Sequence, residues 1–317
     1  MDAMDVVGPL EVFSTALHDK KNPGKQYPSP AGSMATTRPA TTQLTHVPDS
    51  KAFAVVFAAA KQHVTSAQGA RFEANMTFDQ VMKRLPEIDL LVVPGGGHDS
   101  IIKSKAQPIS IIKAFAELQK KSPSRERTLM SVCTGSMFLA EAGILGGLSA
   151  TTHPDYITKL EILCSNVSMR DMAERCDVVE QRYVVNNLRF DLGENEDENP
   201  YVMSRKEYKD HKRRKSSLGG PSSPIEERAP NGARRPSAAR KGSMSWKASN
   251  NRRESVLKRA NLRLGGLRVI TTGGVTAGID GALYMVGAMV SDEVADEVAR
   301  VMCYTWKKGM VVDGTDV

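Results

Sequence analysis

One cysteine is the strongest candidate for chemistry in this sequence. Residues 129–147, LMSVCTGSMFLAEAGILGG, form an apolar run that stops at Cys133, passes through Thr-Gly-Ser and resumes as a helical pattern ending in glycines. The pattern predicts a strand, a tight turn at Gly135 and a helix that ends near Gly143. Such a turn lifts a side chain out of a sheet, as the nucleophile elbow of hydrolases does for serine. Cys133 is therefore the candidate nucleophile.

The position of Cys133 at a helix N-terminus predicts a lowered thiol pKa, because unpaired amides and the helix dipole favour the thiolate. The alternative interpretation is a small buried core residue. The other cysteines, Cys164, Cys176 and Cys303, lack a comparable turn and are interpreted as structural. The four cysteines show neither CxxC pairing nor His-rich spacing, so we expect no metal site and no cofactor.

Two further segments offer partners for a nucleophile. VVPGGGHDS (92–100) predicts a strand followed by a glycine-rich turn, and the amides of Gly95 and Gly96 would stabilise an oxyanion together with that of Thr134. The alternative is an ordinary βα loop. LSATTHPDY (148–156) places His153 between a short strand and a helix start, either as a base or orienting partner or as a polar cap residue.

Short apolar runs alternate with helical patterns along the chain, which predicts an α/β domain with a parallel sheet sandwiched between helices. The expected strands are 52–59, 88–94, 127–132 and 267–272. The expected helices are 9–17, 77–84, 108–120, 135–143, 154–163, 276–289 and 291–306. An Asn-Asn pair inside QRYVVNNLRF (181–190) predicts a β-hairpin.

The basic charge of the chain is confined to one segment. Residues 191–264 hold 18 Lys and Arg against 10 Asp and Glu, while the remainder holds 25 against 26. This segment is rich in Ser, Arg, Pro and Gly and poor in apolar residues, so we expect a disordered basic insertion. The folded domain would comprise 1–190 plus 265–317, with a long Pro-rich loop at 19–50.

Four segments together resemble the ThiJ/PfpI superfamily, whose fold is that of class I glutamine-amidotransferase domains. They are MDVVGPLEVF (4–13), DLLVVPGGG (89–97), SVCTGSMFLAEAGILGGLSATTHPDY (131–156) and TTGGVTAGIDGAL (271–283). The resemblance implies a flavodoxin-like, mostly parallel sheet between helices. DVVGP and SVCTGS are most similar to the isonitrile-hydratase branch, whose enzymes add water to an isonitrile and give an N-substituted formamide.

The resemblance also implies roles for particular residues. Cys133 would attack the isonitrile carbon, Asp5 would hydrogen-bond the thiol or move its proton, and Thr134 and Gly96 would line the site. His153 matches a histidine near the cysteine in deglycase relatives. A carboxyl group beside a thiolate tends to stay protonated, so Asp5 would be able to donate a proton. The alternative for Asp5 is a residue of helix N-cap type.

The sequence departs from the superfamily pattern in three places. Thr134 follows the cysteine where the proteases usually have His, and no His-x-Glu pair follows residue 264, which disfavours protease and glutaminase chemistry. Only four residues precede Asp5, so we expect the apolar first strand of the relatives to be missing, which would leave strand edges open.

The basic insertion repeats a pattern of two basic residues, a spacer and Ser, which basophilic kinases recognise. We hypothesise phosphorylation at four positions, Ser216, Ser237, Ser243 and Ser255. KRRK (212–215) offers nuclear import or nonspecific nucleic-acid contact as a weaker alternative.

Three functions therefore compete: an isonitrile hydratase-like lyase, a glyoxalase- or deglycase-like enzyme acting on reactive carbonyls, and a cysteine redox sensor. The first two act on a small molecule, and the superfamily resemblance implies a homodimer. The sequence has no run of about eighteen apolar residues and no basic leader region. We therefore expect a cytoplasmic protein without a membrane or nucleic-acid partner.

Overall fold

The computed structural model describes residues 1–18, 51–104, 107–123, 125–187, 202–204 and 263–313. Its centre is a six-stranded sheet with the order β10-β12-β9-β11-β6-β5. The strands are β5 (Leu90–Val93), β6 (Thr128–Val132), β9 (Tyr183–Asn187), β10 (Val202–Ser204), β11 (Arg268–Thr272) and β12 (Gly309–Asp313). All neighbours run parallel except β9 and β11. The predicted mostly parallel sheet is therefore confirmed.

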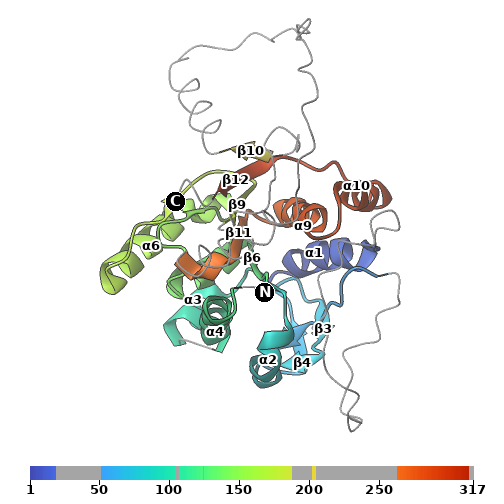
Figure 1. Ribbon diagram of the computed structural model, residues 1–317. Helices are drawn as coiled ribbons and strands as arrows, with labels where there is room; N and C mark the ends of the chain where they lie inside the picture. The colour runs from blue at the N-terminus through green and yellow to red at the C-terminus, as the bar shows by residue number, and fades with distance from the viewer. Residues whose placement is uncertain (19–50, 105–106, 124, 188–201, 205–262, 314–317) are drawn as a thin grey trace, which may run out of the picture.

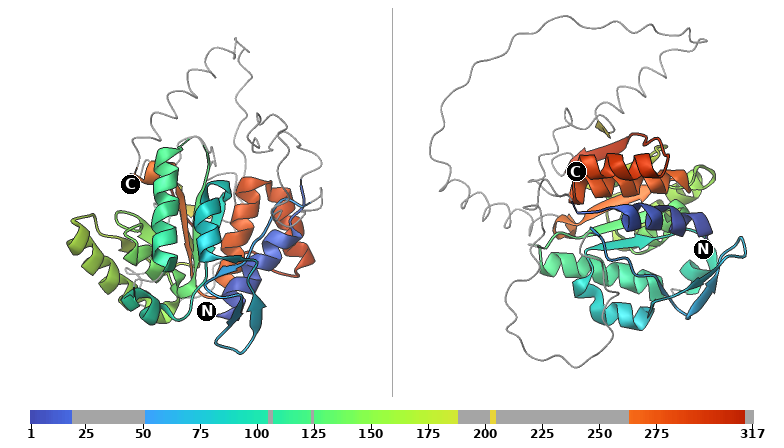
Figure 2. Two further views of the ribbon diagram at one scale, coloured as in Figure 1. Left: turned by 90° about the horizontal axis from the view of Figure 1, so that it is seen from below. Right: turned by 90° about the vertical axis from the view of Figure 1, so that its right-hand side faces the viewer.

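Helices cover both faces of this sheet (Figures 1 and 2). One face carries α1 (Ala3–Thr15), α9 (Thr276–Met289) and α10 (Asp292–Val301). The other carries α2 (Phe78–Arg84), α3 (His98–Ser104), α4 (Gln107–Lys121), α5 (Ser136–Glu141) and α6 (Ile157–Asp171). Every residue of the central strands β6, β9 and β11 is buried, because helices on both sides exclude water from a parallel sheet.

Helix α9 lies close to the sheet because it carries glycine where side chains of the strands approach it. A Cβ on Gly278 would lie 2.8 Å from Cγ1 of Val132, and one on Gly281 would lie 2.7 Å from Cγ2 of Thr272. Glycine at these two positions therefore permits the close packing of α9 on the sheet. This packing fixes the carboxyl ends of β6 and β11, where the candidate nucleophile follows.

Short strands make three two-stranded pairs in the described part of the chain. They are β1 (Ala58–Ala59) with β4 (Met76–Thr77), β2 (His63–Thr65) with β3 (Arg71–Glu73), and β7 (Ser149–Ala150) with β8 (Asp177–Val178). Four 3-10 turns complete the connections around the sheet, at Leu85–Glu87, Cys133–Gly135, Pro154–Tyr156 and Arg263–Gly266. Among the described residues, no helix is long and apolar enough to span a membrane.

Two predicted elements differ in the structure near the N-terminus. The first helix begins at Ala3 rather than residue 9, so Asp5 lies in its first turn. The predicted strand 52–59 pairs only at Ala58–Ala59, with β4. The other residues of that segment are not paired in a strand within the described chain.

The predicted hairpin at 181–190 is wrong for the residues described. Asn186 and Asn187 lie inside β9, which runs straight between β11 and β12. The carboxamide of Asn186 accepts from Ser149 N–H (3.1 Å) and donates to Ser149 C=O (2.7 Å). An asparagine satisfied in this way is accommodated in a buried strand and does not need a turn.

The whole predicted loop 19–50 and most of the predicted insertion 191–264 lie outside the described residues, as do the four candidate phosphorylation sites. Within the second range, Val202–Ser204 pairs with β12 and Arg263–Gly266 forms a turn. The insertion and its serines therefore remain predictions.

Candidate active site

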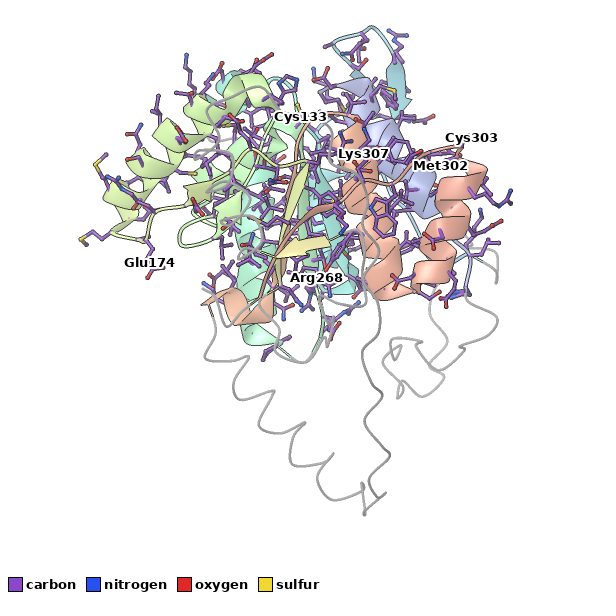
Figure 3. All side chains as sticks on the ribbon, turned by 90° about the horizontal axis from the view of Figure 1, so that it is seen from above. Cys133, Glu174, Arg268, Met302, Cys303 and Lys307 are labelled. Atoms are coloured by element: carbon purple, nitrogen blue, oxygen red, sulfur yellow. The ribbon has the colours of Figure 1, made fainter. Side chains whose placement is uncertain are left out.

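Cys133 lies at the carboxyl end of β6, on the sharp turn between this strand and α5 (Figure 3). Its φ of 56° is in the left-handed region, which costs of order 1–3 kcal/mol for a residue with a side chain. Backbone contacts hold the turn: Cys133 N–H donates to Gly273 C=O (2.9 Å), and Cys133 C=O accepts from the hydroxyls of Ser136 and Thr152 (3.1 Å each). The predicted strand, turn and helix are confirmed.

The glycine after the elbow has a different role from the one expected. Gly135 has an ordinary helical φ of −58°, and the left-handed conformation belongs to Cys133 itself. A Cβ on Gly135 would lie 2.2 Å from the carbonyl oxygen of Val93, so glycine is required because the elbow passes directly over the end of β5. Gly143, with φ of 75°, follows α5 as predicted.

Asp5 brings a carboxyl group to the thiol from α1. The residue is fully buried, and its Oδ1 accepts from Val275 N–H (3.2 Å). Its Oδ2 is buried without a hydrogen-bond partner among the described residues, and one of its carboxylate oxygens lies within 4.8 Å of the Cys133 sulfur. A Cβ on Gly95 would lie 2.7 Å from Oδ2 of Asp5 and 2.9 Å from both Cβ of Cys133 and N of Thr134. The Asp5 carboxyl group, the Cys133 side chain and the amide nitrogen of Thr134 therefore all lie around Gly95.

Burial raises the pKa of both groups in this pair. The pKa of Asp5 is raised chiefly by desolvation, with a further contribution from the charge of Asp2. The pKa of the Cys133 thiol is raised from 9.0 to about 12 by burial and by the nearby Asp5 carboxylate. The predicted thiolate with a lowered pKa is therefore wrong, because loss of water and a neighbouring negative charge outweigh the hydrogen bond from Thr134 N–H.

Asp2 is a site residue that the sequence interpretation missed. Oxygen atoms of Asp2 and Asp5 and the sulfur of Cys133 all lie within 4.8 Å of one another. The Nε2 of Gln68 donates to the Asp2 carboxylate, which fixes its position at the start of α1. These three groups could hold a divalent ion through two carboxylates and a thiolate. The Asp pair near the N-terminus was the available signal, but its proximity to Cys133 depends on tertiary structure.

One of the predicted anion-binding amides already has a partner in this structure. Gly96 N–H donates to the hydroxyl of Thr134 (2.9 Å). Gly95 lies against Asp5, Cys133 and the amide nitrogen of Thr134. The structure thus brings all three predicted residues to the nucleophile, and their role toward an oxyanion stays a prediction.

His153 lies at the edge of the site rather than in the thiol–carboxyl pair. Its Nδ1 accepts from Asp155 N–H (3.3 Å), which caps the turn before α6. Its ring packs edge-on against Tyr156, with 5.9 Å between ring centroids. The adjacent Thr152 donates its hydroxyl to the Cys133 carbonyl oxygen. The arrangement agrees with the cap alternative, and a catalytic role for His153 stays a prediction.

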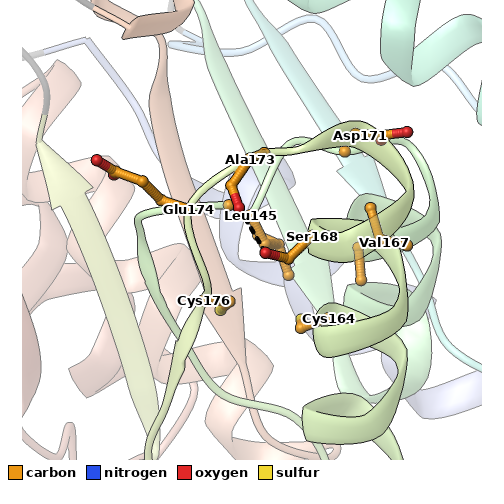
Figure 4. A pocket seen from close by; sticks show the side chains of 11 residues that line it. Leu145, Cys164, Val167, Ser168, Asp171, Ala173, Glu174 and Cys176 are labelled. Carbon is orange, nitrogen blue, oxygen red and sulfur yellow. Dashed lines mark hydrogen bonds between the residues drawn. The ribbon is translucent and has the colours of Figure 1, made fainter.

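A small pocket of about 40 Å³ lies between α5 and α6 and is lined by Cys164 and Cys176 (Figure 4). Glu174 also lines it, and Figure 3 shows this residue well apart from Cys133. The side chains of Cys164 and Cys176 also pack against the apolar core of this layer. Their predicted structural role fits these positions.

Residues 34–187 match the model of the DJ-1/PfpI family. Just under half of the chain is therefore similar to the DJ-1/PfpI family, as the sequence resemblance predicted. This match includes Cys133 and His153 but neither Asp5 nor Val275, so the case for the carboxyl group depends on the geometry described above.

One curated relative is isonitrile hydratase from Pseudomonas putida, which is 34% identical over 93 residues. That alignment covers 29% of this chain and 36% of the enzyme, so the chain matches well under half of its relative. Solved structures include a ThiJ/PfpI family protein from Pseudomonas syringae (18% identity, 96% of this chain and 71% of the other, TM-score 0.47). DJ-1beta from Drosophila melanogaster is also similar (14% identity, 77% and 78%, TM-score 0.38).

Proposed function

We propose that the protein is a cysteine-dependent lyase that adds water to an isonitrile and yields an N-substituted formamide. The observation that carries this proposal is the buried Asp5 carboxyl group, one oxygen of which lies within 4.8 Å of the Cys133 sulfur at a left-handed elbow. The similarity to an isonitrile hydratase supports the same reaction class. This chemistry needs a nucleophile and a group that moves its proton, and the proximity of Cys133 and Asp5 supports these two roles.

The reaction begins with addition of the thiol to the terminal carbon of R–N≡C. The S–H bond breaks, an S–C bond forms, and the proton passes through Asp5 to the same carbon, which gives R–N=CH–S–Cys133. Water then adds to this carbon and one of its protons goes to nitrogen. The C–S bond breaks, the remaining hydroxyl proton returns to sulfur through Asp5, and R–NH–CHO leaves.

The raised thiol pKa fits this sequence of steps. The substrate carbon must receive both sulfur and a proton, so a thiol that transfers its proton during attack delivers both from one place. Asp5 can accept that proton because its carboxyl group lies beside the thiol, and its own raised pKa makes it a stronger base than an ordinary aspartate.

The same pKa argues against a redox sensor at this position. Oxidation by peroxide proceeds through the thiolate and is fastest at exposed cysteines of low pKa. Cys133 is 6% exposed, and its pKa is raised to about 12. Action on reactive carbonyls uses the same nucleophile and is separated from isonitrile hydration by substrate testing.

The test is formamide production from a simple alkyl isonitrile by the wild type, Cys133→Ser and the control Cys303→Ser, whose cysteine is exposed and free. We expect turnover in the wild type and in the control, and none in Cys133→Ser. Each protein is first shown to melt cooperatively. Folded wild type without turnover, or unchanged turnover in Cys133→Ser, would refute the proposal, and methylglyoxal would be the next substrate.

A further inference from the structure

The turn between β11 and α9, residues 273–276, bonds both groups of the thiol–carboxyl pair through its backbone. Gly273 C=O accepts from Cys133 N–H (2.9 Å), and Val275 N–H donates to Oδ1 of Asp5 (3.2 Å). Cys133 follows β6 and Asp5 lies in α1, so the two groups reach the site from different elements. The conformation of this turn therefore sets how the carboxyl group lies relative to the thiol.

Val275 adopts a backbone conformation that its own side chain disfavours. Its φ of 41° lies in the left-handed region, which a β-branched residue rarely occupies because its Cβ crowds the backbone. The residue is 37% exposed, so tight packing of its side chain does not account for this conformation. A strained backbone persists only where the surrounding structure holds it. The turn therefore needs an anchor.

Arg182, which directly precedes β9, holds this turn at both ends. Its backbone C=O accepts from Gly273 N–H (2.8 Å), at the first residue of the turn. Its guanidinium group donates to the hydroxyl of Thr276 (3.1 Å), at the last residue of the turn. The same group donates from Nε to Oδ2 of Asp280 (2.5 Å), one helical turn further along α9. Asp280 is fully buried, and its Oδ1 accepts from Lys307 N–H (3.0 Å).

Tyr304 joins the same network from the segment after α10. Its hydroxyl accepts from Nη2 of Arg182 (3.3 Å) and donates to Thr276 C=O (3.0 Å). The planar guanidinium group therefore donates in fixed directions to a carboxylate and two hydroxyls, which a single lysine ammonium group does not reproduce. This network fixes the first turn of α9 against the start of β9, and with it the strained turn that carries the Val275 amide.

We propose that Arg182 is a positioning residue for the Cys133–Asp5 pair. Arg182 is bonded to the turn 273–276, and this turn is bonded to both reacting groups, so the side chain acts through the turn and not on the substrate. Its effect on turnover rests on the proposed isonitrile hydration, whereas its effect on the reactivity of the thiol rests on the geometry alone.

The test compares Arg182→Met with its parent in two backgrounds, the natural chain and Asp5→Asn. In the natural chain we expect kcat for isonitrile hydration to fall at least about tenfold, with KM changed less than about twofold. In Asp5→Asn the same substitution should change kcat less than about twofold, because the group that Arg182 positions is already gone. Equal fold-losses of kcat in the two backgrounds would overturn the proposal, because they indicate a merely structural role.

Alkylation of Cys133 by iodoacetamide gives the same comparison without the proposed reaction. Burial, and after it the charge of Asp5, raises the pKa of the thiol, so displacement of the carboxyl group should speed alkylation. At pH 8 we expect Arg182→Met to react at least about threefold faster in the natural chain and within about twofold of its parent in Asp5→Asn. An unchanged rate in the natural chain, or equal acceleration in both backgrounds, would overturn the proposal. Alkylation as expected in a wild type without isonitrile turnover would refute the proposed function alone.

Two further variants separate positioning from loss of the fold. Arg170→Met is the control, because its partly exposed guanidinium group pairs with Glu141 (2.6 Å) and Asp171 (2.8 Å) on α5 and α6, away from the turn. It should change kcat and alkylation less than about twofold. If Arg182→Met leaves the buried Asp280 carboxylate unpaired and does not melt cooperatively, Arg182→Met/Asp280→Asn takes its place, with the same expected and contradicting results.

Discussion

Replacing Asp5 with asparagine tests whether the carboxyl group moves the proton of Cys133. With a thiol pKa of about 12, only about one molecule in 100,000 carries the thiolate at pH 7, against about one in 100 for the ordinary value of 9.0. A mechanism that waited for free thiolate would therefore lose about a thousandfold in reactive species. Transfer of the proton to Asp5 during attack avoids this loss, because free thiolate need not form first. The Asp5→Asn variant should lose about 100- to 10,000-fold in kcat/KM for isonitrile hydration.

Stability measurements separate this loss from a loss of fold. The pKa of Asp5 is raised in the folded protein, so the unfolded state loses its proton at lower pH. Asp5 therefore favours the folded state below the unfolded pKa, and this contribution is lost as the pH rises through the folded pKa. At pH 7 the melting temperature of Asp5→Asn should be equal to or higher than that of wild type. At pH 4 the melting temperature of wild type should rise relative to that of Asp5→Asn. Asp296→Asn, exposed on α10, is the control for both measurements.

The assay compares kcat/KM between pH 5 and pH 10 for wild type, Asp5→Asn and the control. Activity of Asp5→Asn within threefold of wild type would refute proton transfer through this carboxyl group. A wild-type rate that rose tenfold with each pH unit across the range would also refute it, because that profile indicates reaction through free thiolate. An Asp5→Asn protein that melted far below wild type at pH 7 would show that the electrostatic reasoning about its burial is wrong.

Three further predictions concern the same site. Gly135→Ala should lower the free energy of unfolding in urea by at least about 1–3 kcal/mol, because its Cβ would meet the Val93 carbonyl oxygen at 2.2 Å. The control Gly273→Ala, whose Cβ would have its nearest atom at 3.4 Å, should cost less. Equal losses in the two variants would contradict the argument. Asp2→Asn should speed iodoacetamide alkylation of Cys133, because the charge of Asp2 raises the pKa of the thiol; an unchanged rate would contradict this. In wild type at pH 8, mass spectrometry should find exposed Cys303 alkylated well before Cys133, and the reverse order would show that the site is open.

The sequence was sufficient to predict the sheet and the elbow because both depend on local pattern. The apolar run before Cys133 and the helical pattern after it determine a strand, a turn and a helix wherever they are packed. The pKa of Cys133 was predicted in the wrong direction because it depends on groups distant in the chain. Asp5 lies 128 residues away and reaches the thiol only once α1 packs on α9. Local helix geometry favours the thiolate, and the tertiary environment reverses that preference.

The strand predicted at 52–59 shows what a local sequence pattern cannot predict. Its residues are suited to a buried strand, yet pairing requires a neighbour, and next to most of this segment the described chain has a groove instead. The residues that precede Asp5 contact the same groove. Asp2 N–H donates to Gly95 C=O (3.1 Å), and Met1 lines the groove. The first residues of the chain therefore connect this groove with the thiol–carboxyl pair.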